Sequence, residues 1–135
     1  MKDTMTDIIK KGTVLIVKPE KVPRKKDMVL SYEEFGKVIQ GNLQIIRCKE
    51  LSVAFIFNKD RKELCLPLNR AILNSDHKIS HLLFGPFIVV GLDENLNYTG
   101  LTQEQLGYYK NRFYVPSRMV MVDGKPKIVF DLLAR

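Results

Sequence analysis

The 135-residue sequence contains no tryptophan, only two cysteines and two histidines, and no long hydrophobic run. Its most apolar stretch, around residues 87–90, is far shorter than the about 20 residues that a membrane-spanning helix needs. The amino-terminal residues lack the apolar segment of a secretion signal. Cys48 and Cys65 lie far apart and form no C-x-x-C motif, which is typical of reduced thiols. We therefore expect a cytoplasmic protein with no membrane partner.

The sequence also lacks the common catalytic motifs, since G-x-S-x-G, G-x-x-x-x-G-K-[ST] and G-x-G-x-x-G are all absent. The histidines, His77 and His81, have Asp76 beside them but no H-E-x-x-H pattern, which favours a solvent-exposed pair over a metal site. Cys48 and Cys65 stand in apolar, strand-like contexts that are typical of protonated, buried thiols. We expect no catalytic residue, metal or cofactor; an enzyme of unfamiliar design is the alternative.

The composition is that of a soluble globular domain, with 45% hydrophobic and 27% charged residues. A chain of this length buries about two-thirds of its surface on folding, which is enough for a core without disulfides or metals. We expect a single domain over residues 1–135. It would comprise a core at about 12–114, a basic loop at 19–28 and a C-terminal hairpin at 118–131.

The charge is strongly positive, because 22 lysines and arginines face 15 aspartates and glutamates, giving a net charge of +7. The excess gathers near the start of the chain and centres on Arg24, Lys25 and Lys26. Such a run usually belongs to a solvated loop that keeps a protein soluble. It is also a candidate binding arm for an acidic protein surface, a nucleic acid or a phosphorylated ligand.

Short apolar or β-branched runs predict the strands of the fold. They occur at residues 13–17, 43–48, 52–57, 63–66 and 84–91. The last run is apolar throughout, which is typical of a strand buried on both faces at the centre of a sheet. Residues 69–81 are polar and irregular, so we expect a loop or a single helical turn there.

Two capping boxes predict helices, one from Ser31 to Glu34 and one from Thr102 to Gln105. The first helix would end at Gly41-Asn42 in a left-handed conformation. Between two apolar runs, Asp123-Gly124 predicts a β-hairpin. Together these elements predict an α+β fold, a mainly antiparallel sheet with two helices on one face and a C-terminal β-hairpin.

Several short segments follow one another in a recognisable order. They are Gly41-Asn42-Leu43-Gln44, Phe57-Asn58, Leu66-Pro67-Leu68-Asn69-Arg70, Gly85 to Gly91 and Leu101 to Gln105. Over about Gly12 to Tyr114 this order resembles the family called domain of unknown function 3846. That family usually has Gly-Gly where this chain has Gly41-Asn42, and an acidic residue in place of Gln44. The resemblance implies an accessory protein of phages, plasmids or integrative elements, and it implies no reaction.

Aromatic and cationic side chains alternate between residues 108 and 114, an arrangement that single-strand nucleic-acid binders use. On a helix, however, Tyr109 and Phe113 share one face and would pack on the sheet. The residues left for a partner or ligand would be Tyr108, Lys110, Arg112 and Tyr114. The segment is thus both a core element and a candidate contact surface.

Two further segments are candidates for binding. Asn69 and Arg70 follow a predicted strand, where Asn69 would turn the chain and Arg70 could face an anionic ligand. In the C-terminal hairpin, Met119 and Met121 share one face while the two valines between and after them take the other. A hairpin that is apolar on both faces suggests burial in a dimer or partner interface.

The sequence therefore favours a non-enzymatic binding protein of a phage or mobile element. Its partner would be a host protein or protein–nucleic acid complex with an acidic surface, and the effect would be to antagonise a host defence system. Direct nucleic-acid binding is one alternative, and a nucleotide-like anion held near Asn69 and Arg70 is another. A homodimer through the C-terminal hairpin is the remaining alternative for that surface.

Overall fold

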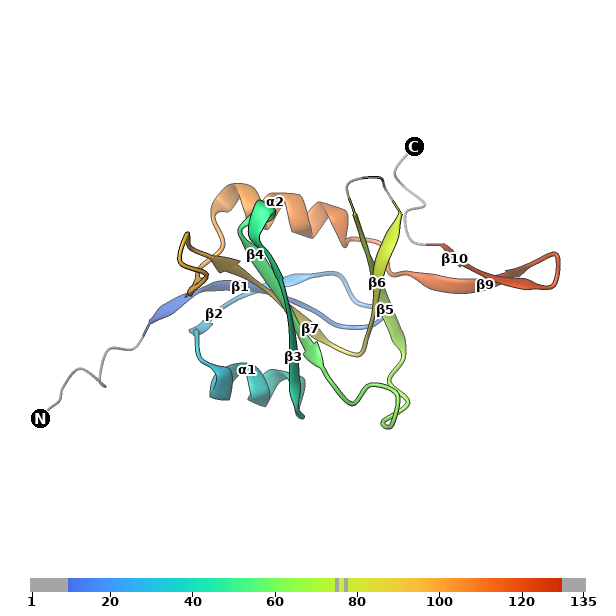
Figure 1. Ribbon diagram of the computed structural model, residues 1–135, viewed down its shortest axis with the longest axis horizontal. Coiled ribbons are helices and arrows are strands. Elements are labelled where there is room, and N and C mark those ends of the chain that lie inside the picture. Colours follow the sequence, from blue (N-terminus) through green and yellow to red (C-terminus); the bar gives the residue numbers. More distant parts are fainter. Residues whose placement is uncertain (1–9, 75, 77, 130–135) are drawn as a thin grey trace, which may run out of the picture.

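The computed structural model describes residues 10–74, 76 and 78–129, and its main element is an antiparallel sheet that crosses the molecule (Figure 1). The strand order is β2-β1-β7-β4-β3, and β8 pairs with β7. Every pairing in this sheet is antiparallel. The strands are β1 (Lys11–Val17), β2 (Arg24–Val29), β3 (Leu43–Cys48), β4 (Val53–Asn58), β7 (Phe87–Leu92) and β8 (Tyr98–Thr99). A short 3-10 turn, Lys49–Leu51, joins β3 to β4.

Strand β7 lies between β1 and β4 and is buried along its whole length. Phe87 and Val89 belong to the apolar cluster on one face of the sheet, and Ile88 and Val90 to the cluster on the other. Successive residues of a strand point to opposite faces, so a strand that is apolar throughout needs cover on both sides. The prediction of a central strand here is confirmed.

The two helices cover opposite faces of the sheet (Figure 1). Helix α1 (Tyr32–Ile39) buries Phe35 in one cluster, and helix α2 (Gln103–Arg112) buries Leu106 in the other. The α+β class, the antiparallel sheet and the hairpin are as predicted, but the placement of both helices on one face is wrong. Because the inner strands are apolar on both faces, a single helical layer would leave one face in water.

Both helices begin where the sequence predicts. The Ser31 hydroxyl accepts from the Glu34 N–H at 3.1 Å, and Thr102 and Gln105 form a complete capping box. Helix α1 ends earlier than expected, at Gln40, whose φ of 59° is left-handed. Gly41 serves a different purpose, because a Cβ there would lie 2.5 Å from Asn58 Nδ2.

Strands β5 (Leu68–Leu73) and β6 (Ile79–Phe84) form a separate antiparallel hairpin. The strand expected at 63–66 lies instead in a turn, and the loop expected over 69–81 is largely strand, so both predictions are wrong. The hairpin contributes Ile72 and Leu83 to the same apolar cluster as α2. It therefore shares one face of the sheet with α2.

Part of the expected basic loop at 19–28 is the edge strand β2, which pairs with β1 from Lys11↔Val29 to Ile16↔Arg24. Only the residues before Arg24 form a turn. The sequence of β2 shows no apolar alternation because an edge strand exposed to solvent does not need it.

Strands β9 (Arg118–Val122) and β10 (Lys125–Val129) form the predicted C-terminal hairpin. Asp123 and Gly124 form its turn with φ values of 53° and 77°, the two positive angles that suit a two-residue hairpin loop. The hairpin projects from the side of the molecule (Figure 1). The outer part of β9 thus stands away from the central sheet.

Candidate functional site

The open edge of the sheet presents Arg24, Lys25 and Lys26, all exposed, on β2. Arg24 lies opposite Ile16 and Lys26 opposite Val14, and both of these β1 residues are buried on the α1 side. Opposed residues of an antiparallel pair point to the same face. Arg24 and Lys26 therefore lie on the α1 face and Lys25 on the α2 face, so the edge is positive on both faces.

Two more lysines from the turn before β2 join these residues around a groove of about 490 Å³. We call the five cations lining it the basic edge: Lys18, Lys21, Arg24, Lys25 and Lys26. Within the described part of the chain, no carboxylate lines this groove. Of the neighbouring acids, Asp27 accepts a hydrogen bond from Thr13, and Glu20 pairs with Arg118 at 3.5 Å. The basic edge is suited to an anionic partner.

The basic edge continues to the start of helix α2. Lys25, Lys26 and Asp27 of β2 border a groove of about 250 Å³ together with Thr13 of β1 and with Gln103 and Leu106 of α2. Because α2 covers the face on which Lys25 lies, a partner that contacts Lys25 would also meet the first turn of this helix.

In the aromatic segment at the end of α2, the buried and the exposed side chains fall where helical spacing predicts. Tyr109 and Phe113 are buried, with stacked rings whose centroids lie 5.9 Å apart. Arg112 is half-buried, and its Nη2 donates to the carbonyl oxygen of Ala71 at 3.3 Å, so this side chain helps to pack β5 against α2. Three of the predicted contact residues remain exposed: Tyr108, Lys110 and Tyr114.

Asn69 and Arg70 are not a surface turn but buried residues of β5, and Arg70 is only 1% exposed. Arg70 Nε donates to the Phe113 carbonyl at 2.7 Å, and its Nη2 donates to the Lys21 carbonyl at 2.6 Å. Asn69 Nδ2 donates to the Val17 carbonyl at 2.9 Å. The expectation that Asn69 turns the chain and Arg70 faces an anionic ligand is wrong, because both side chains are buried and donate their hydrogen bonds to backbone carbonyls inside the fold.

The C-terminal hairpin is apolar and exposed, as its sequence suggests. Met119 is 58% and Met121 67% exposed, and Val120 and Val122 on the other face are also exposed. Exposed large apolar side chains on both faces of one hairpin are unusual on a free surface. Whether a partner or a second copy covers them stays a prediction.

The titratable candidates are dispersed. His81 lies on strand β6 rather than on a helix, and His77 lies outside the described residues. Among the described residues, no group of three His, Cys, Asp or Glu side chains could hold a metal ion. Burial, followed by the neighbouring Glu50, raises the pKa of the Cys48 thiol. Cys65 is exposed in a turn, so its expected place in a buried strand is wrong.

Sequence analysis did not single out Arg61 or Lys62, and it considered His81 only as one of a solvent-exposed pair of histidines. The structure brings these three residues to one groove. Arg61 and Lys62 follow β4, and His81 comes from β6, so about twenty residues of sequence separate them. No local pattern links a charged turn to a histidine in a strand, and at this histidine the sequence predicts a loop. Only the packing of the β5–β6 hairpin over the sheet places them together.

The family model of a domain of unknown function, DUF3846, matches residues 9–114. This stretch contains the whole basic edge and helix α2, and it stops before the β9–β10 hairpin. No curated protein and no solved structure matches the chain. Within the described residues, no helix has the length and apolar character to cross a membrane.

Proposed function

The chain belongs to the family DUF3846, and from this premise we propose that it is a non-enzymatic binding protein that holds an acidic surface of a macromolecule. The proposal extends to its biology: a phage or mobile element would use it to occupy a host protein or protein–nucleic acid complex and so to antagonise a host defence system. The cytoplasm is the compartment in which it would act.

The observation that carries the proposal is the basic edge itself. Five cations line one groove, and they lie at an edge of the sheet, where β2 pairs with β1 and with no other strand of the described residues. A cluster of one sign steers an oppositely charged partner and sets the orientation in which it docks. The free backbone groups of an edge strand can also pair with an extended acidic segment, which adds directional hydrogen bonds to the charge attraction.

The β9–β10 hairpin would supply the apolar part of the interface. Charge complementarity contributes mainly to association rate and specificity, whereas buried apolar anchors hold a complex together. Met119 and Met121 are flexible, polarisable side chains that adapt to different surfaces. A homodimer through the same two residues is the alternative use of this hairpin.

Charge reversal tests the role of the basic edge. The variant carries Arg24→Glu, Lys25→Glu and Lys26→Glu, and its matched control carries Lys49→Glu, Lys59→Glu and Lys78→Glu, three lysines that are exposed elsewhere. Binding to a fluorescent poly-glutamate peptide is measured by anisotropy at low salt. We expect binding to be lost in the first variant and reduced far less in the control, which has the same net charge. Equal losses in both would refute a specific role for the basic edge.

Direct nucleic-acid binding is the second candidate, because Tyr108 and Tyr114 are exposed aromatic residues and Lys110, between them in the sequence, is an exposed cation. Rings of this kind can stack with unpaired bases while cations neutralise phosphates. Single-stranded and duplex oligonucleotides therefore replace the peptide in a parallel salt titration. An affinity that falls steeply with salt, and falls further in Tyr108→Ala with Tyr114→Ala, supports this function. Absence of binding at low salt excludes it.

A further inference from the structure

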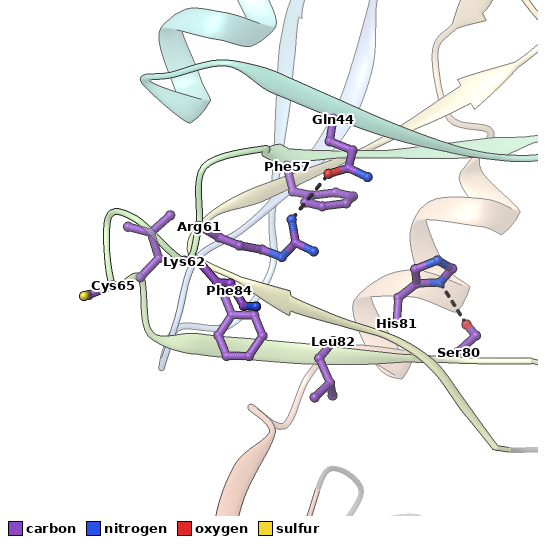
Figure 2. Close-up of a pocket in the computed structure, with 10 residues that line it drawn as sticks. Gln44, Phe57, Arg61, Lys62, Cys65, Ser80, His81, Leu82 and Phe84 are labelled. Carbon is purple, nitrogen blue, oxygen red and sulfur yellow. Dashed lines mark hydrogen bonds between the residues drawn. The ribbon is translucent and has the colours of Figure 1, made fainter.

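A second groove, separate from the basic edge, lies where the β5–β6 hairpin meets the central sheet. Its volume is about 500 Å³. Gln44 of β3 and Phe57 of β4 form one side, and the loop after β4 contributes Arg61 and Lys62 (Figure 2). Strand β6 contributes His81. The groove is thus built from three segments that the fold brings together: β3, β4 with the loop that follows it, and β6.

We propose that this groove binds a nucleoside phosphate. Arg61 and Lys62 would contact the phosphate, and the apolar side chains that line the groove would contact the base. Its volume falls within the range of about 300–1,000 Å³ that is usual for small-ligand sites. This inference is independent of the binding function proposed for the basic edge, because the two grooves share no lining residue.

The charge of the groove selects an anion. Arg61 and Lys62 both line it, and none of its lining residues within the described part of the chain is an aspartate or a glutamate. No carboxylate among the described residues forms an ion pair with either cation. A phosphate group would supply the charge that the protein does not, and guanidinium–phosphate hydrogen bonds are strong and directional.

Arg61 is held in place before any ligand arrives. Its Nη1 donates to Gln44 Oε1 at 3.3 Å, and its guanidinium carbon lies 5.4 Å from the centre of the Phe57 ring (Figure 2). A guanidinium has five N–H donors, so the bond to Gln44 leaves others for a phosphate. Because the side chain is already ordered, binding costs less conformational entropy than it would for a free arginine.

The β6 side of the groove suits the base. Ser80 Oγ donates its proton to the Ile72 carbonyl at 3.1 Å, so it can only accept from His81 Nδ1, which lies 3.1 Å away. The neutral imidazole then has its Nε2 as an acceptor, which suits an exocyclic amino group such as that of adenine. Phe84 is half-buried and also lines the groove, but it lies on the opposite face of β6 from His81, so its ring adds apolar surface to the groove away from the imidazole.

Calorimetry with AMP tests the site, and adenosine and inorganic phosphate serve as partial ligands. We expect saturable 1:1 binding of AMP, at least tenfold tighter than that of either part, because the groove recognises both ends. The variant Arg61→Ala with Lys62→Ala should bind AMP at least tenfold more weakly. The matched control, Lys49→Ala with Lys125→Ala, removes the same number of charges from exposed positions outside both grooves and should bind AMP as the wild type does.

Thiol protection gives a readout that does not depend on those variants folding. Cys65 is exposed and lines the groove, whereas Cys48 lies outside it and is half-buried. AMP should slow the alkylation of Cys65 several-fold and leave that of Cys48 unchanged, as followed by mass spectrometry. The inference is overturned if AMP does not bind saturably at millimolar concentration, if it leaves Cys65 unprotected, or if the Arg61 and Lys62 variant binds it normally. None of these results bears on poly-glutamate binding, so the two proposals fail separately.

Discussion

Arg70 donates from Nε to the carbonyl oxygen of Phe113, 2.7 Å away, and this bond ties β5 to the end of helix α2. The same guanidinium reaches the carbonyl of Lys21 in the turn before β2. Burial lowers the pKa of Arg70 to about 10, an effect that Glu20 partly opposes, so the group remains charged at neutral pH. Its charge faces the negative end of a helix dipole. One buried cation thus fixes the position of the turn that carries part of the basic edge.

Replacing this guanidinium should destabilise the fold. Arg70→Met keeps much of the apolar stem but leaves the carbonyls of Phe113 and Lys21 without their donor. Buried acceptors that lose their partners cost about 1–3 kcal/mol each, so we expect the free energy of unfolding to fall by about 3 kcal/mol. Urea denaturation followed by circular dichroism measures it. A loss below about 1 kcal/mol would contradict the role assigned to Arg70.

Two glycines should respond to alanine in opposite directions. Gly107 lies within α2, and a Cβ there would meet nothing within 4 Å. Gly107→Ala should therefore stabilise the protein by about 0.5–1 kcal/mol. At Gly12, a Cβ would lie 2.7 Å from the Cα of Gly100, where two backbones cross, so Gly12→Ala should destabilise it by about 1–3 kcal/mol. Thermal unfolding of both variants checks this, and a stabilising Gly12→Ala would disprove the close approach.

Stability should decline at high pH because of Tyr109. Burial, and to a lesser degree Tyr108 and Cys48, raises the pKa of its phenol far above the usual value of 10.0. The folded state keeps this proton where the unfolded chain loses it, so the unfolded state binds fewer protons above about pH 10. Stability then falls as pH rises, by at most about 1.4 kcal/mol per pH unit.

The matched variant is Tyr109→Phe, which keeps the ring and removes the proton. Its free energy of unfolding should fall less steeply between pH 9 and 11 than that of the wild type. Arg70 acts in the opposite direction in this range, since its lowered pKa lets the folded state lose a proton first, but both proteins contain it. Identical pH slopes for the two proteins would show that Tyr109 ionises without unfolding.

Substitutions in the exposed hairpin can test self-association while leaving the stability of the fold nearly unchanged. Met119→Ser with Met121→Ser changes two side chains that are more than half exposed, so unfolding should shift by less than about 0.5 kcal/mol. If the hairpin mediates a homodimer, this variant should sediment as a monomer at concentrations where the wild type is a dimer. A wild type that stays monomeric at every concentration would refute the homodimer.

The elements that sequence analysis located correctly are those with a local physical signal. The apolar run before Gly91 predicts the central strand, and Thr102 with Gln105 predicts the start of α2. Asp123-Gly124 predicts the hairpin turn, because both residues adopt the positive φ that this turn requires. Each of these features is decided by residues that are neighbours along the chain.

The elements that sequence analysis missed depend on distant partners. Asn69 and Arg70 are polar enough to indicate a loop, yet β5 buries them because carbonyls 52 and 43 residues away accept their protons. Strand β2 looks like a loop because its charged side chains face solvent on both sides of an edge. The apolar run at 84–91 indicates that both faces of the sheet need cover, but which helix covers which face depends on contacts between distant segments.

The candidate sites also differ in whether neighbouring or distant residues define them. Arg24, Lys25 and Lys26 could be singled out because they are consecutive and charged. The groove at Arg61 could not, since its far wall comes from His81 on a strand that the sequence does not predict. The burial of Tyr109 and Phe113 could be predicted because residues four apart share one helical face, which left Tyr108 and Tyr114 as the exposed aromatic residues.

The β9–β10 hairpin begins at residue 118, four residues after the family match ends at 114. Ser117 fastens its base to β5, where its N–H donates to the Asn69 carbonyl and its hydroxyl accepts from the Ala71 N–H. The exposed part of the hairpin makes no contribution to either apolar cluster of the described residues. The sequence of the outer hairpin can therefore change without disturbing the packing of the domain that the family model covers.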